Sequence, residues 1–305
     1  MKKEFLTVKS NCDGLPLSVA VFTPEKSDIK GIFQISHGMA EHKERYFDFM
    51  EFLTDNGYAA VINDHRGHGG SVRSEKDYGY FYDETSDYIT EDLYQITELA
   101  KEKFPGKPVA LFGHSMGSLV VRKYIRKYDD KIDKLIVCGS PSANPLVGMA
   151  IGIVRAEKRL RGDRHRSMTI QKLAFGSYTK NLSGSLSQNA WLSVNDQNVR
   201  DYDKDKMCGF VFTLNGFLNL FLLMKQVYDP KGWGVKNPNL PILFIAGSED
   251  PVIAGEKNWN KSQDFLRERG YRDVSGRLYP GLRHEILNED GAGEIYDNII
   301  EFAES

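Results

Sequence analysis

Short apolar segments that favour β-strands alternate with helical patterns at both ends of this 305-residue chain. The strand-like segments are residues 17–22, 32–36, 58–62, 109–112, 135–138, 242–246 and 277–279. Helical patterns lie between or after them, for example at residues 119–128, 257–269 and 292–302. This alternation predicts βαβ units, and therefore a mostly parallel central sheet that is flanked by helices.

The middle of the chain, residues 141–235, breaks this rhythm. It contains no clear strand, but it has two helical stretches at residues 146–160 and 210–227. The simplest interpretation is one α/β core, formed by residues 1–140 and 236–305, with a helical insertion between the strands at 135–138 and 242–246.

Charge and cysteine content narrow the range of functions. A net charge of -2 gives no general attraction to nucleic acid, and no Cys/His set has zinc-finger spacing. The three cysteines, Cys12, Cys138 and Cys208, are far apart, which is typical of a reducing compartment. Charged residues interrupt any apolar run at the N-terminus, so this segment does not resemble a signal peptide. No apolar stretch approaches the roughly 20 residues of a membrane span. We therefore expect a cytoplasmic protein that does not bind nucleic acid.

The segment 113–117 reads Gly-His-Ser-Met-Gly and matches the G-x-S-x-G nucleophile elbow. In such an elbow the serine occupies a tight turn between a strand and a helix, and the glycines leave room for that backbone. The pattern alone is weak, but here an apolar strand leads into it and a helical pattern follows it. Ser115 is therefore the predicted nucleophile.

An acid and a histidine should follow the serine along the chain, each after a strand. The strand at 242–246 runs into Gly247, and Asp250 lies in the following loop, with Glu249 beside it as the alternative acid. His284 follows the last predicted strand. We expect His284 to accept the Ser115 proton, and Asp250 to orient the imidazole and stabilise its protonated form. The chain is thus predicted to be a serine hydrolase.

The negative charge that develops on the attacked carbonyl needs two converging N–H donors. The N–H of Met116, directly after the nucleophile, is the first candidate. The loop after the strand at 32–36 supplies the second, which we assign to the N–H of Met39.

Five segments occur together and in order: residues 37–42, 64–71, 113–117, 247–252 and 283–285. With them the chain resembles the monoglyceride lipase and lysophospholipase group of α/β-hydrolases, the serine aminopeptidase S33-type family that has many bacterial members. The resemblance extends from about residue 32 to the C-terminus. It implies an α/β-hydrolase fold with a helical cap after the sixth strand, and no cofactor. It also implies carboxylic ester substrates such as monoacylglycerols or lysophospholipids, cleaved through an acyl-enzyme.

The same resemblance suggests residues that contact the substrate. Glu41 and Arg45 match family positions near the glycerol-binding end, although their i,i+4 spacing equally suits an ion pair on a helix surface. His114, inside the elbow, is a further candidate. In the cap, some of Phe217, Phe221, Leu218, Leu222 and Met224 are expected to wall an acyl channel, while the same stripe can also pack the cap onto the core.

The first helical stretch of the insertion begins apolar and ends with Arg155, Lys158, Arg159 and Arg161. Two interpretations stay open. The stretch either contacts a membrane surface transiently, with its basic side drawn to anionic headgroups, or it is a solvated, salt-bridged face.

The loop at residues 64–69 contains Asp64, His65 and His68, which could suggest a metal site. Such Gly-rich loops more often form turns through local hydrogen bonds, and we therefore expect no metal.

Two other functions remain as alternatives to ester hydrolysis. A serine aminopeptidase or amidase would use the same triad, but it needs acidic groups in the cap to hold a free amine. The cap acids include Glu157, Asp163, Asp196, Asp201, Asp203 and Asp205. A non-catalytic ligand receptor of the same fold is the second alternative, although such receptors typically lack a triad member and this chain has all three.

Overall fold

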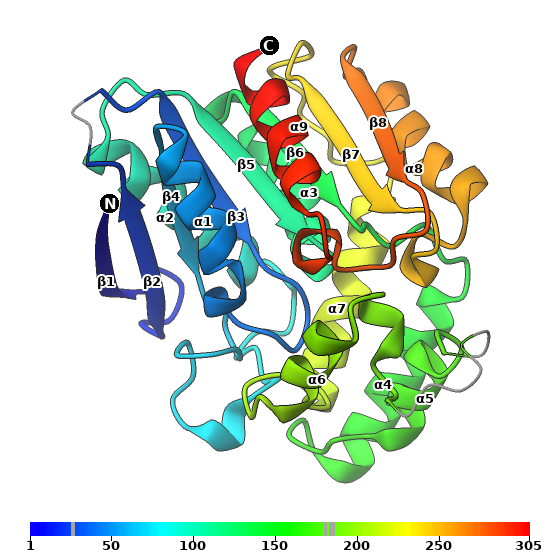
Figure 1. The fold of residues 1–305 in the computed structure, drawn as a ribbon. Coiled ribbons are helices and arrows are strands. Elements are labelled where there is room, and N and C mark those ends of the chain that lie inside the picture. Colours follow the sequence, from blue (N-terminus) through cyan, green and yellow to red (C-terminus); the bar gives the residue numbers. More distant parts are fainter. Residues whose placement is uncertain (26–27, 180–181, 183–186) are drawn as a thin grey trace.

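The segments predicted as strands lie side by side in one sheet (Figure 1). This computed structural model describes residues 1–25, 28–179, 182 and 187–305. Within those residues the sheet has eight strands in the order β1-β2-β4-β3-β5-β6-β7-β8. The strands are β1 (Lys2–Lys9), β2 (Pro16–Thr23), β3 (Gly31–Ser36), β4 (Tyr58–Asn63), β5 (Val109–His114), β6 (Lys134–Cys138), β7 (Ile242–Gly247) and β8 (Val274–Tyr279). The β1/β2 and β2/β4 pairs are antiparallel and the other neighbouring pairs are parallel, which confirms the predicted mostly parallel sheet.

Helices cover both faces of the sheet, because the strands of its centre are apolar on both sides. One face packs against α1 (Phe47–Asp55) and α9 (Gly293–Glu304). The other face packs against α2 (Tyr88–Lys103), α3 (Met116–Tyr128) and α8 (Glu256–Arg269).

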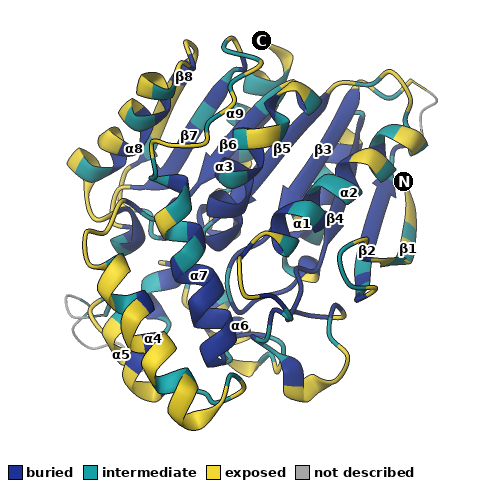
Figure 2. Cartoon of the chain, turned by 180° about the vertical axis from the view of Figure 1, so that it is seen from behind, coloured by how far each residue is buried: buried dark blue, intermediate teal, exposed yellow. Residues whose placement is uncertain are grey.

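The helical insertion after the sixth strand is present, and it lies beyond the carboxyl ends of the parallel strands (Figure 1). Its helices are α4 (Val147–Arg161), α5 (Met168–Phe175), α6 (Asp196–Lys204) and α7 (Leu214–Val227). α7 packs against α3 and α4, and its apolar side chains join the hydrophobic cluster of one sheet face. In Figure 2 α7 is dark blue along most of its length, whereas the outer faces of α4 and α5 are yellow. The cap is therefore fixed to the core chiefly through α7.

Among the strands and α-helices of the described residues, strand β1 and helices α5 and α6 were not predicted. Each is short or carries few buried apolar side chains, so its hydrophobic pattern is weak. Within the described ranges, no helix is long and apolar enough to cross a membrane. The cytoplasmic location and the exact limits of the cap, residues 141 and 235, stay predictions.

Candidate active site

Ser115 lies between β5 and α3, at the turn that the elbow motif predicts. Its backbone has φ 53° and ψ -118°, a conformation that non-glycine residues rarely adopt. A Cβ at Gly117 would lie 2.0 Å from the carbonyl oxygen of Ser36, and one at Gly113 would lie 2.5 Å from that of Gly117. Both glycines are therefore needed for the close approach of α3 to β3 and β5.

His284 and Asp250 form a buried pair behind this turn. The His284 Nδ1 lies 2.8 Å from Asp250 Oδ2, and the other Asp250 oxygen accepts the Val252 N–H at 2.8 Å. The exposed fractions of His284 and Asp250 are 2% and 3%. Because an ionised carboxylate only accepts hydrogen bonds, Nδ1 carries the proton and Nε2 is left as the basic nitrogen.

Ser115 and His284 both line a cavity of about 540 Å³ between the sheet edge and the cap. The predicted oxyanion donors line it as well. Met116 is the first residue of α3, where the N–H has no partner within the helix. Met39 is in the loop after β3, and this loop passes so close that a Cβ at Gly38 would lie 3.2 Å from Ser115 Cβ. The Gly38 N–H is occupied by the Glu41 carboxylate, so Met39 has the next N–H along the loop.

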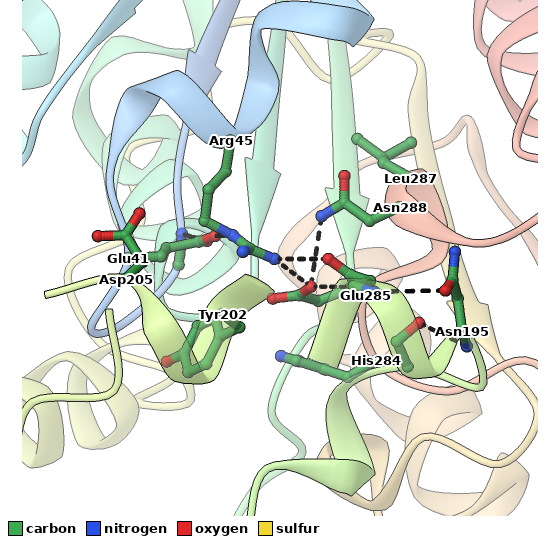
Figure 3. Close-up of polar contacts among 12 residues, drawn as sticks. Glu41, Arg45, Asn195, Tyr202, Asp205, His284, Glu285, Leu287 and Asn288 are labelled. Atoms are coloured by element: carbon green, nitrogen blue, oxygen red, sulfur yellow. Dashed lines mark hydrogen bonds and ion pairs between the residues drawn. The ribbon is translucent and has the colours of Figure 1, made fainter. Parts of the chain in front are cut away.

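Glu41 and Arg45 form a buried ion pair, not one on a helix surface. The Arg45 Nε lies 3.3 Å from Glu41 Oε2, and the Arg45 guanidinium also binds Glu285 (Figure 3). The guanidinium donates to Asn198 Oδ1 as well, at 3.1 Å. Burial alone would raise the pKa of Glu41, but His114 and Arg45 hold that pKa well below its usual range. Glu41 and Glu285 line the cavity, whereas Arg45 lies behind them and holds both carboxylates in place.

His114 links this ion pair to the loop that carries His284. Its Nε2 lies 3.1 Å from the His284 carbonyl oxygen and its Nδ1 lies 3.0 Å from the Tyr46 hydroxyl, which itself donates to Glu41. Burial disfavours a charged imidazole, yet the Glu41 carboxylate raises the pKa of His114 above its usual value. His114 also lines the cavity, where the sequence had suggested a substrate contact.

Phe217 and Phe221, the predicted channel residues, do not line this cavity. Both are buried in the core cluster beside α3, as are Leu218 and Leu223. Because α7 is apolar around most of its circumference, its sequence does not indicate which face meets the cavity. That face carries Leu220 and Met224. The other apolar wall residues include Met168, Phe175, Tyr178, Trp191, Leu192 and Phe210.

The histidine-rich loop after β4 is held by hydrogen bonds. His65 Nε2 lies 2.8 Å from Ser36 Oγ, and Asp64 binds the Lys43 ammonium at 2.8 Å. Burial lowers the pKa of His68 to about 3 and places the pKa of His65 well below its usual value, so both rings are neutral.

A second cluster of possible metal ligands joins His42 to Asp205 and Cys208 of the cap, with one ligand atom of each within 4.8 Å of the others. Both nitrogens of His42 already face carboxylates, those of Glu44 and Asp205. Burial opposes protonation of His42, but these two carboxylates raise its pKa. The cluster is therefore satisfied as an ion pair between core and cap.

Fold and site together define the class of the protein: it is an α/β-hydrolase, with a serine elbow and a His–Asp pair at the carboxyl edge of its sheet. The family model described as Serine aminopeptidase, S33 matches residues 27–291, and the chain belongs to this family. The predicted fold class and the predicted relationship to monoglyceride lipases are confirmed.

Several known proteins are similar to this chain over most of their length. A monoglyceride lipase homolog of monkeypox virus is 37% identical over 263 residues, which cover 85% of this chain and 83% of the viral protein. A monoacylglycerol lipase of Mycolicibacterium smegmatis is 26% identical over 289 residues, with 94% and 92% covered. The structure of a thermostable carboxyl esterase from Bacillus coagulans in complex with glycerol superimposes with a TM-score of 0.92 at 24% identity, covering 100% and 98% of the two chains. These relatives support the predicted assignment to the hydrolytic enzymes.

Proposed function

We propose that this protein is a serine hydrolase that cleaves the carboxylic ester of a monoacylglycerol, a lysophospholipid or a similar small acyl ester. The observation that carries the proposal is the cavity that Ser115 and His284 share, because it joins a nucleophile and a base to an apolar wall from the cap. The names of the relatives, monoacylglycerol lipase and monoglyceride lipase, support a monoacyl lipid.

The proposed mechanism is supported by the hydrogen bond between His284 and Asp250 and by the position of Ser115 on the same cavity as His284. The Ser115 hydroxyl attacks the ester carbonyl carbon while His284 Nε2 takes its proton, and Asp250 stabilises the imidazolium. The Met39 and Met116 N–H groups bind the oxyanion. When the tetrahedral intermediate collapses, the bond to the alcohol breaks and the alcohol oxygen receives the proton from His284. Water then attacks the acyl-enzyme by the same route, which releases the fatty acid and restores Ser115.

The two ends of the substrate have matching surfaces in the cavity. Met168, Trp191 and Leu220 are apolar and suit an acyl chain, whereas Glu41 and Glu285 offer acceptors for hydroxyl groups. We propose that the cap, residues 141–235, selects the substrate through this apolar wall.

Aminopeptidase activity on the same residues is the second candidate, because the family model carries that name. Among the described residues, none of the cap acids Glu157, Asp163, Asp196, Asp201, Asp203 and Asp205 lines the cavity. Glu41 and Glu285 do line it, but both carboxylates already pair with Arg45, and Glu41 also pairs with His114. The site therefore favours an ester without a free amine.

The test is a panel of p-nitrophenyl esters from two to sixteen carbons, with monoacylglycerols and aminoacyl anilides alongside. We expect kcat/KM to peak at medium or long acyl chains, monoacylglycerols to be turned over, and anilides to be cleaved at least about a hundredfold more slowly. Activity confined to acetate and butyrate would contradict the acyl channel. Cleavage of the anilides alone would replace the ester proposal with the aminopeptidase.

Contact with a membrane surface is a separate proposal that the exposed face of the cap supports. Leu160 and Leu173 are 86% and 71% exposed, and Met149 and Met168 are each 65% exposed. Lys158 and Arg164 are paired with Glu84 and Asp77, but Arg155 and Arg159 have no ion pair in the described part of the chain. Free cations beside exposed apolar side chains suit an anionic lipid surface.

Replacing Leu160 and Leu173 together with aspartate should reduce binding to vesicles that contain anionic phospholipid by at least about tenfold, because each leucine loses its burial in lipid. Hydrolysis of a water-soluble ester should not change. Phe5→Asp is the matched control, since Phe5 is 60% exposed on the edge strand β1. Vesicle binding that depends neither on the anionic lipid content nor on the salt concentration would contradict the proposed membrane contact.

A further inference from the structure

The loop that carries the Met39 N–H has an unusual backbone at its next residue. Ala40 is buried and has φ 52°, in the left-handed region that favours glycine. An alanine does not adopt this conformation by its own preference, so contacts around it must hold the loop in place.

Those contacts come from the cap. The Ala40 carbonyl oxygen accepts the hydroxyl of Tyr202 at 2.9 Å and the N–H of Gly209 at 2.9 Å. Tyr202 belongs to α6, and the Arg45 guanidinium lies over its ring at 5.0 Å (Figure 3). Both donors are thus more than 160 positions further along the chain than the peptide they bind.

The cap segment 190–209 is itself anchored on the loop that carries His284. The Glu285 N–H donates to Leu192 O at 2.7 Å, and the Arg283 guanidinium donates to Ala190 O at 2.8 Å. Slightly further along, Glu289 accepts the N–H groups of Val194 and Asn195 at 2.9 and 3.0 Å. One short segment of the cap therefore touches both loops that complete the site around Ser115.

We propose that Tyr202 is a positioning residue for catalysis: its hydroxyl holds the Ala40 carbonyl, and thereby orients the neighbouring Met39 N–H toward the oxyanion. This inference rests on the proposed function. It gives the cap a second task besides selecting the substrate, because the oxyanion hole is complete only while the segment 190–209 is seated on the core. Substrate that lifts this segment would also loosen the Met39 N–H.

Tyr202→Phe tests the inference, because it removes one hydroxyl and keeps the ring under Arg45. We expect kcat for a soluble ester to fall about tenfold with KM changed less than twofold, since a displaced oxyanion donor weakens only the transition state. The inhibition constant of a trifluoromethyl ketone, which binds Ser115 as an anionic hemiketal, should rise by the same factor.

Tyr80→Phe is the matched control. The Tyr80 hydroxyl also bridges core and cap, to Asp163 at 2.8 Å, but neither residue lines the cavity. This variant should keep the kcat and the ketone affinity of the wild type. A rise in KM with unchanged kcat in Tyr202→Phe would make Tyr202 a substrate contact and overturn the inference.

Ala40→Gly provides a rescue, because glycine adopts a positive φ without strain. In the double variant Tyr202→Phe/Ala40→Gly, most of the lost kcat should return, whereas a Tyr202 that matters only for folding would show no such recovery. If wild type lacks Ser115-dependent ester hydrolysis, the proposed function fails and the inference with it. If wild type is active and Tyr202→Phe keeps its full kcat, the inference alone fails.

Discussion

Replacing Ser115 with alanine is expected to reduce kcat/KM for the best ester of the panel by about 10⁵–10⁶-fold. In the proposed mechanism the side-chain oxygen of this residue forms the acyl-enzyme, and the oxyanion donors alone leave a small residual rate. Alanine fits the strained turn as well as serine does, since both carry a Cβ at φ 53°. The thermal unfolding midpoint should therefore change little, and the loss of activity will not reflect a loss of fold.

The matched control for this variant is Ser10→Ala. Ser10 is a buried serine that does not line the cavity, and its hydroxyl donates to Asp92 at 2.5 Å. Its loss should cost about 1 kcal/mol of stability and leave kcat/KM unchanged, the opposite of the Ser115 result.

A fluorophosphonate probe gives the outcome that would contradict the assignment of Ser115. We expect the probe to label wild type and Ser10→Ala but not Ser115→Ala. If the wild-type protein is not labelled by the probe and cleaves no ester, the alternative of a non-catalytic ligand receptor would be favoured. Labelling that survives in Ser115→Ala would place the nucleophile elsewhere.

The core of the fold was predictable because its strands are apolar on both faces and are separated by clear helices. β5 and β4 are buried at every position, so their composition alone marks them. β1 gave no such signal, because it pairs only with β2 and alternates exposed with partly buried residues. Helix α6 was not predicted for a similar reason, because only Val199 and Tyr202 of this helix are buried.

The residues of the candidate site also differ in how well the sequence predicts them. Ser115, Asp250 and His284 each follow a parallel strand, and the topology of the sheet brings such positions to one edge, so chain order was enough to suggest them. Glu285 and Tyr202 have no comparable signal. The contact between Glu285 and Arg45 joins two core loops that are 240 positions apart in the chain. The contact between Tyr202 and Ala40 exists only when the cap is packed on the core, and the position of the cap depends on the packing of α7.

The second prediction with a large expected effect concerns the two candidate acids, Asp250 and Glu249. Asp250→Asn should lower kcat by about 10⁴-fold, whereas Glu249→Gln should leave it within about twofold of wild type. Glu249 is exposed, and Asp250 is buried against His284. An asparagine at position 250 has one oxygen, which the Val252 N–H already binds, so its amide N–H₂ would face His284 Nδ1.

That change moves a proton within the imidazole. A donor opposite Nδ1 makes Nδ1 an acceptor, and the ring proton then sits on Nε2, the nitrogen that accepts the Ser115 proton in the proposed mechanism. The base is blocked although no atom of Ser115 or of the oxyanion donors has been altered, so KM should change far less than kcat. Kinetics of both variants on one ester therefore assign the acid: a large loss in Glu249→Gln with activity retained in Asp250→Asn would reverse the assignment. Equal small losses would mean that His284 holds its tautomer without a carboxylate, and its base function would then depend on some other contact.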